Sequence, residues 1–453
     1  MQVSIIGTGY VGLVSGVCLA EKGHHVTCVD IDPNRVEQIN QGITPIHEEG
    51  LDALLEKNLH HHLYATTDLP AAIQETELSI IAVGTPFNGD EIDLTYIRQA
   101  ATQIGAALRH KPAYHLVVVK STVVPGTTDE VVLPALEAAS GKTAGVDFGV
   151  GMNPEFLREG VAIKDFLSPD RIVLGATDDR SLSILEDLYR VFEDVDILKT
   201  NNKTAEMIKY TSNSLFATMI SFSNEIGNLC AAIGDIDVVD VMQGVHLDRR
   251  LRVTSDAGEH LSPAFVTYLE AGCGFGGSCF PKDVKSLAVH GTKAGHPMRL
   301  LEAVIDVNQD QHQVILDLLN QHFPMLTDIQ IAILGLAFKP GTDDIRESPA
   351  IPVISYLLQA GTRVRAYDPV AKDAMRKLYD EPGMSYCDDL WQTIDEVDAI
   401  VLLTRWDEFH TLPGLLQQSA RQPLFIDGRR MLDKTSIARY EGIGLSPSAR
   451  PNP

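Results

Sequence analysis

Short apolar runs and glycine-rich turns alternate at the start of the chain. Residues 3–6 form an apolar run that leads into GTGYVG at residues 7–12, and residues 13–22 continue with a helix-like stretch. A second apolar-rich run at residues 25–29 ends in Asp30. This order predicts a strand, a tight turn, a helix and a second strand with an acid at its end, which is the arrangement of a nucleotide-binding βαβ unit.

Two further apolar runs predict strands of the same sheet. They cover residues 78–83 and 116–120, and short loops at residues 84–86 and 121–122 follow them. Because ligands of open α/β sheets bind at the carboxyl ends of the strands, we expect both loops to border a ligand site.

The middle of the chain changes to a helical pattern. Residues 203–232 carry apolar side chains at three- and four-residue spacing, which predicts one helix. A helix of that length spans about 45 Å, so we interpret it as a connector between domains. The sequence predicts helices on both sides of the glycine-rich residues 272–277, and residues 301–319 predict a helix that leaves this region.

A second α/β pattern follows. Residues 329–334 predict a strand, residues 335–341 a loop, and residues 363–367 a second strand that ends in Asp368. This half lacks the GxGxxG spacing, so we expect it to do something other than cradle a pyrophosphate. Later strands are predicted at 399–403 and 424–426. The pattern divides the chain into an α/β domain at 1–200, a central helical domain at 201–322, a second α/β domain at 323–440 and a loose tail at 441–453.

Composition narrows the class of protein. The chain has 453 residues, 44% of them hydrophobic and 22% charged, with a net charge of −24. These values are typical of a globular protein of several domains and argue against a nucleic-acid partner, which binds through cationic surfaces. The sequence contains no membrane-spanning run and no secretory signal, and its six cysteines include no CxxC pair. We therefore expect a cytoplasmic protein with reduced thiols, no membrane partner and no metal; His60–His61–His62 is interpreted as a surface turn.

The first glycine turn is the candidate cofactor site. Its glycines permit close approach of backbone to a pyrophosphate at a helix N-terminus, and Asp30 is placed to accept hydrogen bonds from a ribose. An acid at this position repels a 2′-phosphate, so the sequence favours NAD over NADP. Arg35 is interpreted as an adenine or phosphate contact or as a solvated helix residue, and Asp32 as a helix cap. The candidate cofactor-binding residues here are Gly7, Gly9, Tyr10, Val11, Gly12, Asp30 and Arg35.

The densest motif in the chain surrounds a cysteine. In GFGGSCFPKD, residues 274–283, three glycines precede Cys279, and Lys282 and Asp283 place a cation and a base nearby. This pattern favours a thiolate nucleophile. The alternatives are a buried structural cysteine or a disulfide with Cys273, and we interpret the other five cysteines as structural.

Two more clusters carry candidate polar groups. Lys209 and Asn213 are four residues apart on the long predicted helix, so they share one face and could both donate to an oxyanion; the alternative is an ordinary exposed polar pair. NPEFLREG at residues 153–160 places Glu155 and Glu159 four apart, which on a helical turn would face one site, and a capped helix start is the alternative.

Taken together, NPEFLREG, AEMIKYTSN, GFGGSCFPKD and AFKPGTDDIRESPA resemble the UDP-glucose/GDP-mannose dehydrogenase family, over roughly residues 1–440. The resemblance implies an α/β fold with two doubly wound Rossmann-like domains, joined by a long central helix and a helical region that forms a homodimer. It also implies NAD-dependent, four-electron oxidation of a nucleotide sugar at C6 to a carboxylate, with UDP-glucose the first substrate expected.

The resemblance also implies roles for residues of this chain. Cys279 is similar to the family's nucleophile, Lys209 and Asn213 to its oxyanion partners, and Asp283, Thr122 and Glu155 to the groups that assist water, proton transfer and hydrolysis. Further implied cofactor contacts are Thr85, Thr122, Glu159, Lys282 and Arg346. The implied substrate contacts are Glu155, Phe156, Leu157, Arg158, Glu159, Lys209, Asn213, Tyr268, Leu269, Glu270, Ala271, Gly272, Gly276, Lys339 and Arg429.

One segment departs from the family pattern, and alternatives to the implied function stay open. Residues 251–267 do not align with the family segment that carries an arginine across the dimer interface, so Arg249, Arg250 and Arg252 are all candidates for that arginine. GDP-mannose, UDP-galactose or an N-acetylated hexosamine nucleotide is an alternative substrate. The alternative functions are a single-step hydroxyacid dehydrogenase and a non-catalytic, NAD-dependent sensor of nucleotide sugars.

Overall fold

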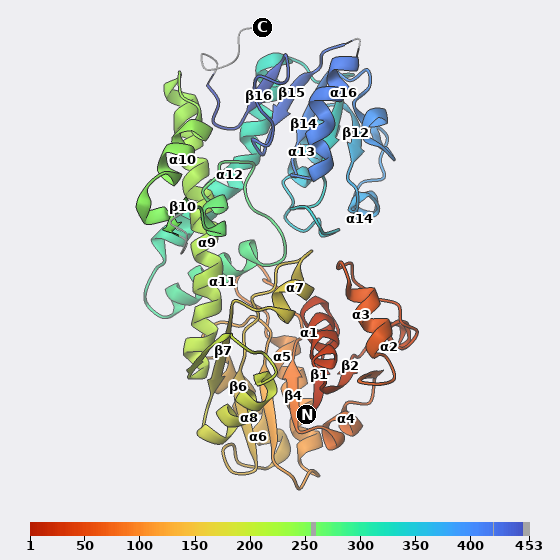
Figure 1. The fold of residues 1–453 in the computed structure, drawn as a ribbon, viewed down its shortest axis with the longest axis vertical. Helices are drawn as coiled ribbons and strands as arrows, with labels where there is room; N and C mark the ends of the chain where they lie inside the picture. Colours follow the sequence, from red (N-terminus) through yellow and green to blue (C-terminus); the bar gives the residue numbers. More distant parts are fainter. Residues whose placement is uncertain (255–259, 420, 447–453) are drawn as a thin grey trace. The chain divides into compact units, whose positions relative to one another are not determined.

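The computed structural model describes residues 1–254, 260–419 and 421–446 of the chain. The chain divides into two compact units, a first unit at Met1–Ser212 and a second unit at Asn213–Pro453. Each unit contains one large sheet, which is labelled in Figure 1. The predicted α/β class, with two Rossmann-like sheets and a long helix between their sequences, is confirmed.

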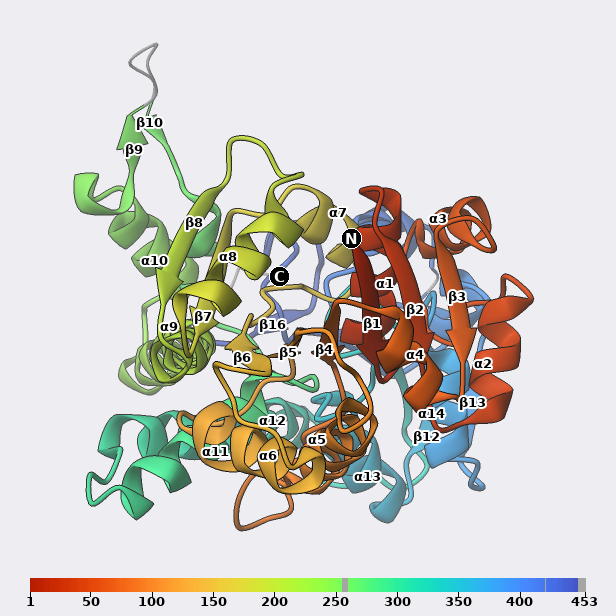
Figure 2. The same cartoon turned by 90° about the horizontal axis from the view of Figure 1, so that it is seen from below.

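The first sheet has the strand order β3-β2-β1-β4-β5-β6-β7-β8, which can be followed across Figure 2. Every neighbouring pair is parallel except β6 and β7. The order reverses between β1 and β4, which places a ligand crevice at their carboxyl ends. The strands are β1 (Gln2–Ile6), β2 (His25–Val29), β3 (Leu63–Thr66), β4 (Leu78–Ile81), β5 (His115–Val119), β6 (Phe148–Met152), β7 (Arg171–Ala176) and β8 (Asp196–Thr200).

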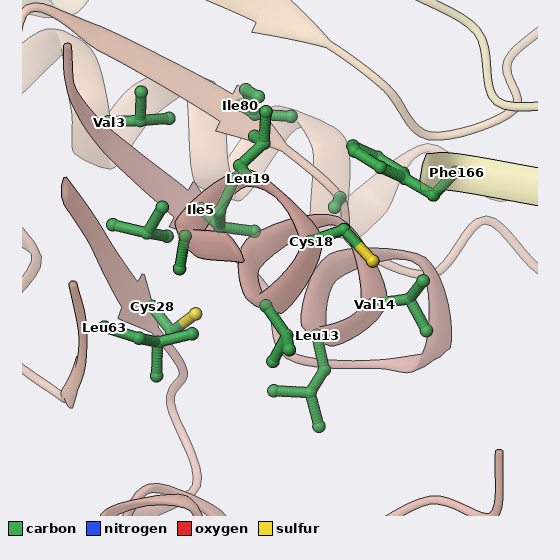
Figure 3. Close-up of a cluster of buried hydrophobic side chains, with 14 of the residues drawn as sticks. Val3, Ile5, Leu13, Val14, Cys18, Leu19, Cys28, Leu63, Ile80 and Phe166 are labelled. Atoms are coloured by element: carbon green, nitrogen blue, oxygen red, sulfur yellow. The ribbon is translucent and has the colours of Figure 1, made fainter. Parts of the chain in front are cut away.

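Helices cover both faces of this sheet because its central strands are apolar on both sides. One apolar core joins the sheet to α1 (Tyr10–Glu21), α2 (Pro33–Asn40), α3 (Leu51–Asn58), α7 (Ala162–Leu167) and α8 (Asp179–Tyr189). A second core joins its other face to α4 (Leu69–Glu75), α5 (Thr95–Leu108) and α6 (Leu133–Ser140), which a π-helical turn at Thr128–Val132 precedes. Figure 3 shows the first core, where Leu13 and Cys18 of α1 lie over Ile5 and Cys28 of the sheet.

A 32-residue helix, α9 (Asn202–Ile233), follows β8 and crosses the boundary between the two units at Ser212. It matches the helix predicted at residues 203–232. The helices predicted on both sides of the glycine-rich segment are found only in part. On its C-terminal side lies α11 (Phe280–Lys293), whereas a 3-10 turn at Ala264–Tyr268 directly precedes it.

The second sheet has the order β13-β12-β11-β14-β15-β16, and all its neighbours are parallel. Its strands are β11 (Gln330–Leu334), β12 (Arg363–Tyr367), β13 (Met384–Tyr386), β14 (Ala399–Leu402), β15 (Leu424–Asp427) and β16 (Tyr440–Gly442). The order again reverses between two central strands, β11 and β14, so this sheet repeats the doubly wound plan of the first. β16 continues the sheet past residue 440, where the predicted domain ends, and Leu445 is also buried.

The helices of the second unit surround this sheet and the glycine-rich loop. α12 (Arg299–His322), α13 (Ala350–Gln359) and α14 (Lys372–Leu378) pack into one core, and α15 (Leu390–Ile394) and α16 (Leu412–Gln418) into another. α10 (Val238–His246), 3-10 turns at Arg249–Leu251 and Asp407–Thr411, and the strand pair β9 (Val253–Thr254) and β10 (His260–Leu261) complete the unit. Within the described residues, no helix is both long enough and apolar enough to cross a membrane.

Candidate active site

The glycines of the turn after β1 have two roles: two are required by the fold, and one leaves space for a ligand. Gly7 has φ +96°, and a Cβ on Gly12 would lie 1.9 Å from the Gly7 carbonyl oxygen, so the fold itself requires both glycines. Gly9 differs, because its φ is −66° and a Cβ there would meet no atom within 4 Å. The chain therefore leaves open space at Gly9, as the close approach of a pyrophosphate to the backbone requires.

The N-terminus of α1 faces this turn. The helix begins at Tyr10, and its cap residue Gly9 offers no side-chain hydrogen bond to the first backbone N–H groups. Those groups and the helix dipole form an anion-binding site. Gly7, Gly9, Tyr10, Val11 and Gly12 thus have the local geometry that binding of an NAD pyrophosphate requires.

Asp30 stands at the end of β2 beside this turn. Its Oδ2 accepts hydrogen bonds from the Thr8 N–H at 2.8 Å and the Thr8 hydroxyl at 2.6 Å, and Oδ1 accepts from the Asp32 N–H at 3.0 Å. Burial opposes ionisation, but these hydrogen bonds and the positive charge of Arg35 outweigh it and lower the pKa of Asp30. An ionised acid that is only half-buried suits a ribose diol. Asp32 caps α2 as predicted.

A buried acid that the sequence motifs do not indicate supports the same turn. Glu48 accepts a hydrogen bond from the Tyr10 hydroxyl, and its two oxygens accept from the N–H groups of Gly160 and Ala162 at 2.7 Å each. Glu48 therefore ties the start of α1 to the end of the NPEFLREG segment. No local pattern marks Glu48, because all of its partners are distant in sequence.

Thr85 and Thr122, predicted from separate loops, lie together. The Thr85 hydroxyl donates to the Thr122 carbonyl oxygen at 2.8 Å, and the Ser121 hydroxyl donates to the Val83 carbonyl oxygen at 2.7 Å. These bonds join the loops that follow β4 and β5, at the strand ends where the sheet order places a ligand.

The prediction that Glu155 and Glu159 lie on a helical turn is wrong. Residues 153–158 have no regular secondary structure, and the segment is fixed by side chains instead. Glu155 is 6% exposed and pairs with Lys209 of α9, with Oε1 and Nζ 2.9 Å apart. Burial opposes ionisation of Glu155, but Lys209, the Leu157 N–H and the charge of Lys120 together lower its pKa.

The neighbours of Glu155 are also held in place. The Arg171 guanidinium lies 3.8 Å from the ring centroid of Phe156, and the Lys209 ammonium lies 5.6 Å from the same ring. Arg158 forms an ion pair with Asp165 at 2.6 Å. Leu157 and Glu159 are half-buried in the same loop. In the first unit the structure thus brings together one carboxylate, one ammonium and an aromatic face.

Cys279 lies in the second unit at the N-terminus of α11. It is the only one of the chain's six cysteines that is not buried, and all six are free thiols, so the alternative of a Cys273–Cys279 disulfide is not found. Its Sγ lies 3.5 Å from the Ser278 hydroxyl. The N-terminus of a helix stabilises negative charge, which favours a thiolate at this position.

Asp283 follows Cys279 by one turn of α11 and is completely buried. It accepts hydrogen bonds from the Asn213 amide at 2.6 Å and the Lys282 ammonium at 2.5 Å. The bond to Asn213 fixes that amide from α9. Residues predicted from two separate motifs, Asn213 of α9 and Lys282 and Asp283 of α11, therefore form one hydrogen-bonded group.

The glycines before Cys279 serve packing within the chain. A Cβ on Gly276 would lie 2.2 Å from the Glu347 carbonyl oxygen, and one on Gly277 would lie 2.7 Å from the Phe338 ring. The Gly277 N–H also donates to the Arg346 carbonyl oxygen at 2.8 Å. At 276 and 277 the missing side chains thus make room for the loop that carries Lys339 and Arg346.

Arg429 organises the loops around this cysteine. Its guanidinium donates to the carbonyl oxygens of Leu403 at 2.7 Å, Gly274 at 2.9 Å and Phe338 at 3.3 Å. These bonds use three of its five N–H donors. Lys339 lies 5.5 Å from the centroid of the Phe338 ring, while the exposed Arg346 binds Asp344 through two hydrogen bonds of 2.8 Å.

Side-chain contacts fix residues 268–272, the segment that leads into the glycine-rich loop. Tyr268 stacks on Phe216 of α9 with ring centroids 4.4 Å apart, and Glu270 pairs with Arg405. Leu269 is half-buried, Ala271 is buried, and the Gly272 N–H donates to the Asn224 side chain at 2.8 Å. Of the candidate arginines, Arg250 pairs with Asp248, and part of the divergent segment, residues 255–259, lies outside the described residues.

No group of three or more His, Cys, Asp or Glu side chains with metal-binding geometry occurs among the residues the structure describes. What the two units do contain is a glycine turn and ribose acid in a doubly wound sheet, and a thiol at a helix N-terminus beside a buried Asp–Asn pair. These features are typical of a nucleotide-binding α/β dehydrogenase, and the second unit adds a candidate nucleophilic thiol.

Comparison with known proteins gives the family. The chain belongs to the UDP-glucose/GDP-mannose dehydrogenase family: the NAD binding domain matches residues 1–193, the central domain 203–310 and the UDP binding domain 332–434. It is an NAD-dependent dehydrogenase.

Three relatives illustrate the similarity. A UDP-glucose 6-dehydrogenase of Haloferax volcanii is 43% identical over 98% of this chain and all of its own length. A GDP-mannose 6-dehydrogenase of Pseudomonas putida is 40% identical, with 98% of this chain and all of the relative covered. The structure of a UDP-glucose dehydrogenase of Pyrobaculum islandicum matches with a TM-score of 0.88 at 38% identity, covering 98% of this chain and 97% of that one.

Proposed function

We propose that the protein oxidises UDP-glucose at C6 to UDP-glucuronate with two molecules of NAD. The observation that carries this proposal is Cys279 at the N-terminus of α11, with Asp283 one turn later and bonded to Asn213. A dehydrogenase that removes only one hydride needs no nucleophilic thiol, whereas the second oxidation of an aldehyde does. The relatives named for UDP-glucose support the choice of substrate.

The chemistry proceeds through the sulfur of Cys279. When bound, NAD accepts the hydride that leaves C6, once in each oxidation. The C6 alcohol loses a hydride and a proton to give an aldehyde, and the thiolate adds to that aldehyde to form a thiohemiacetal. Loss of a second hydride and a proton gives a thioester, and water cleaves it to the carboxylate and the thiol. One alcohol thus gives two NADH.

The buried polar groups supply what these steps require. In our proposal, Lys209 and Asn213, one turn apart on α9, donate to the oxygen that carries negative charge at C6. Glu155 is ionised beside Lys209. Glu155 and Asp283 hold or accept the protons of the water and of the alcohol, and Thr122 orients the water. The substrate contacts are the remaining predicted residues of the loops at 156–159 and 268–272, together with Gly276, Lys339 and Arg429.

The cofactor contacts proposed for NAD lie mainly in the first unit. The pyrophosphate binds at residues 7–12, the adenosine ribose at Asp30, and Arg35 lies beside them with its guanidinium 3.4 Å from the Thr8 carbonyl oxygen. Thr85, Thr122, Glu159, Lys282 and Arg346 complete the proposed set. We also propose that the three functional domains end at residues 200, 322 and 440.

We further propose that the protein is a cytoplasmic homodimer. Leu215, Phe222 and Leu229 recur every seven residues on α9, and their side chains are 55%, 51% and 53% exposed. A row of exposed apolar residues on one helix face suits a second copy of the chain. Light scattering of the wild type and of Phe222→Glu tests the dimer: the variant is expected to lower the mass in solution by half. The six free thiols support a reducing compartment.

The count of NADH per sugar nucleotide tests the function. We expect two NADH for each UDP-glucose consumed and a uronate as product. One NADH would instead indicate a single-step dehydrogenase, and binding without NADH a sensor. The same assay with GDP-mannose, UDP-galactose and N-acetylated hexosamine nucleotides tests the substrate; GDP-mannose is the second candidate because a GDP-mannose 6-dehydrogenase is 40% identical to this chain.

A further inference from the structure

A buried ammonium that the proposed mechanism does not use lies beneath the Glu155 loop. Lys120 follows β5 directly and is 4% exposed. Its Nζ donates to Asn153 Oδ1 at 2.7 Å and to the Tyr189 hydroxyl at 3.4 Å, and it lies 5.7 Å from the Phe166 ring centroid. Asn153 opens the segment that contains Glu155, and its own amide donates to the Val173 carbonyl oxygen at 3.0 Å.

Lys120 is buried without a carboxylate at ion-pair distance. None of the ion pairs found within 1–254, 260–419 and 421–446 includes it. The carboxylate that acts on it is Glu155, which already pairs with Lys209 at 2.9 Å. The group formed by Lys120, Glu155 and Lys209 therefore holds two positive charges and one negative charge.

A cavity of about 70 Å³ borders Lys120 and Glu155. Lys120, Asn153 and Glu155 line it together, as does Tyr189. The other charged side chains on its wall are Arg158, Asp165, Asp170 and Arg171. Arg158 and Asp165 neutralise each other as an ion pair, and Arg171 lies over Phe156. On this wall Lys120 is the buried cation that faces Glu155, in addition to Lys209, which pairs with Glu155 directly.

We propose, resting on the function proposed above, that Lys120 is a positioning residue for thioester hydrolysis: it holds the Asn153–Glu155 turn and shares the Glu155 carboxylate with Lys209. With Lys120 charged, Glu155 does not fully neutralise Lys209. The Lys209 ammonium then keeps positive charge for the oxyanion that forms when water attacks the thioester. With Lys120 neutral, Glu155 and Lys209 form a balanced pair and this stabilisation weakens.

The titration of Lys120 gives the proposal a measurable signature. Burial disfavours its charged form, Glu155 favours it and Lys209 opposes it, and together they lower the pKa of Lys120 to about 8. Lys120 therefore loses its positive charge as the pH rises through about 8. We expect the rate of thioester hydrolysis to fall over the same interval.

Two substitutions at Lys120 separate its charge from its hydrogen bond. Lys120→Gln keeps a donor for Asn153 but carries no charge, and Lys120→Arg keeps the charge at every accessible pH, with the neighbouring cavity providing room. The matched control is Lys111→Gln at the other end of β5. Lys111 is also buried, and its ammonium donates to the carbonyl oxygens of Ile73, Gln74 and Thr76 at 2.8 Å each.

The experiment measures single-turnover formation of NADH and of uronate with UDP-glucose between pH 6 and 10, together with thermal unfolding. Lys120→Gln is expected to hydrolyse the thioester at least about tenfold more slowly at pH 7, while the first NADH forms near the wild-type rate. In Lys120→Arg the fall near pH 8 is expected to move up by more than one unit. Lys111→Gln is expected to lower thermal stability and to leave the pH profile unchanged.

Two results would overturn the role of Lys120. One is a Lys120→Gln variant that hydrolyses the thioester at the wild-type rate with the wild-type pH profile. The other, decisive also where Lys120→Gln does not fold, is a Lys120→Arg variant whose rate still falls near pH 8. The wild-type control separates this inference from the proposed function, because a wild-type chain that makes one NADH or none from UDP-glucose contradicts the function itself.

Discussion

The two sheets of this chain carry an aspartate at the same place and use it differently. Asp30 directly follows β2 of the first sheet, and Asp368 directly follows β12 of the second. Asp30 is half-buried, and its hydrogen bonds come from Thr8 and Asp32. Asp368 is 2% exposed and accepts five hydrogen bonds, from the backbone N–H groups of Leu336, Ala337, Val370 and Ala371 and from the Trp406 indole.

The glycines that follow β1 and β11 also differ between the sheets: only the first sheet leaves space for a ligand. Gly7 and Gly335 both adopt positive φ, +96° and +91°, because the chain turns sharply at both places. Only the first sheet continues to a glycine whose missing side chain leaves open space, Gly9; the second continues with Leu336 and Ala337, both buried. The shared strand-glycine-helix-strand-acid pattern therefore specifies the fold of both halves, whereas Gly9 and an accessible acid specify a dinucleotide site in one.

Removal of the Asp368 carboxylate should have the largest effect. Asp368→Ala leaves five donors, three of them buried, without their acceptor, and we expect the free energy of unfolding to fall by about 3 kcal/mol or more. Urea unfolding of the full chain measures this loss. Asp368→Asn, which keeps one acceptor oxygen, should lose less. An Asp368→Ala protein as stable as the wild type would show that this acid is not structural.

A pair of alanine substitutions tests the two kinds of glycine. Gly335→Ala combines a positive φ with a Cβ 2.4 Å from the Thr404 Cβ, so we expect a loss of about 2 kcal/mol in stability. Gly9→Ala should leave the stability of the apoprotein unchanged and weaken NAD binding about tenfold, because its methyl group occupies the space left for the pyrophosphate. Calorimetric titration with NAD and urea unfolding separate the two effects. A Gly9→Ala chain with unchanged affinity would contradict the assignment.

Substitution of Asp30 should act on the cofactor rather than on the fold. Asp30→Ala removes a charged acceptor for the ribose hydroxyls, and we expect NAD to bind about tenfold more weakly. The preference for NAD over NADP should narrow as well, since the acid no longer repels a 2′-phosphate. Titration of both dinucleotides against wild type and Asp30→Ala provides the measurement, and an unchanged ratio of the two affinities would count against the ribose contact.

The contribution of Asp30 to stability should be the smallest effect, and it depends on pH. Since the pKa of Asp30 is lower in the folded chain, its contribution is present above the unfolded pKa, about 3.9, and is lost as the pH falls through the folded value. The half-exposed carboxylate limits this contribution to less than about 1 kcal/mol. Unfolding of wild type and Asp30→Asn should differ by a constant amount from pH 7 to 5 and converge below pH 4. A difference that grows on acidification would contradict this sign.

Local patterns predicted most of the fold, because its strands and long helices are marked by apolar periodicity. The helix expected at residues 203–232 is found at Asn202–Ile233. The errors occur where distant contacts decide the conformation. Glu155 lies in an irregular loop that Lys209 holds, and the glycines at 276 and 277 make room for the 338–347 loop.

The candidate site was predictable where a motif carries its own chemistry. The GxGxxG turn and the GFGGSCFPKD segment are contiguous, so each could be recognised from the sequence. Glu48 and Lys120 could not be, because each acts through partners more than thirty residues away: Gly160 for Glu48 and Asn153 for Lys120. The one local signal for Lys120 is its position at the end of a continuous apolar strand, because a lysine there is expected to be buried together with its charge.

In the proposed reaction the Cys279 sulfur bonds to C6 of the sugar. Glu155→Gln should slow hydrolysis and let the thioester accumulate when the protein is mixed with UDP-glucose and NAD. Intact-mass measurement followed by peptide mapping of the quenched mixture tests this directly. We expect one UDP-glucuronyl group per chain, on the peptide that contains Cys279. Steady formation of uronate with no adduct, or an adduct on another cysteine, would contradict it.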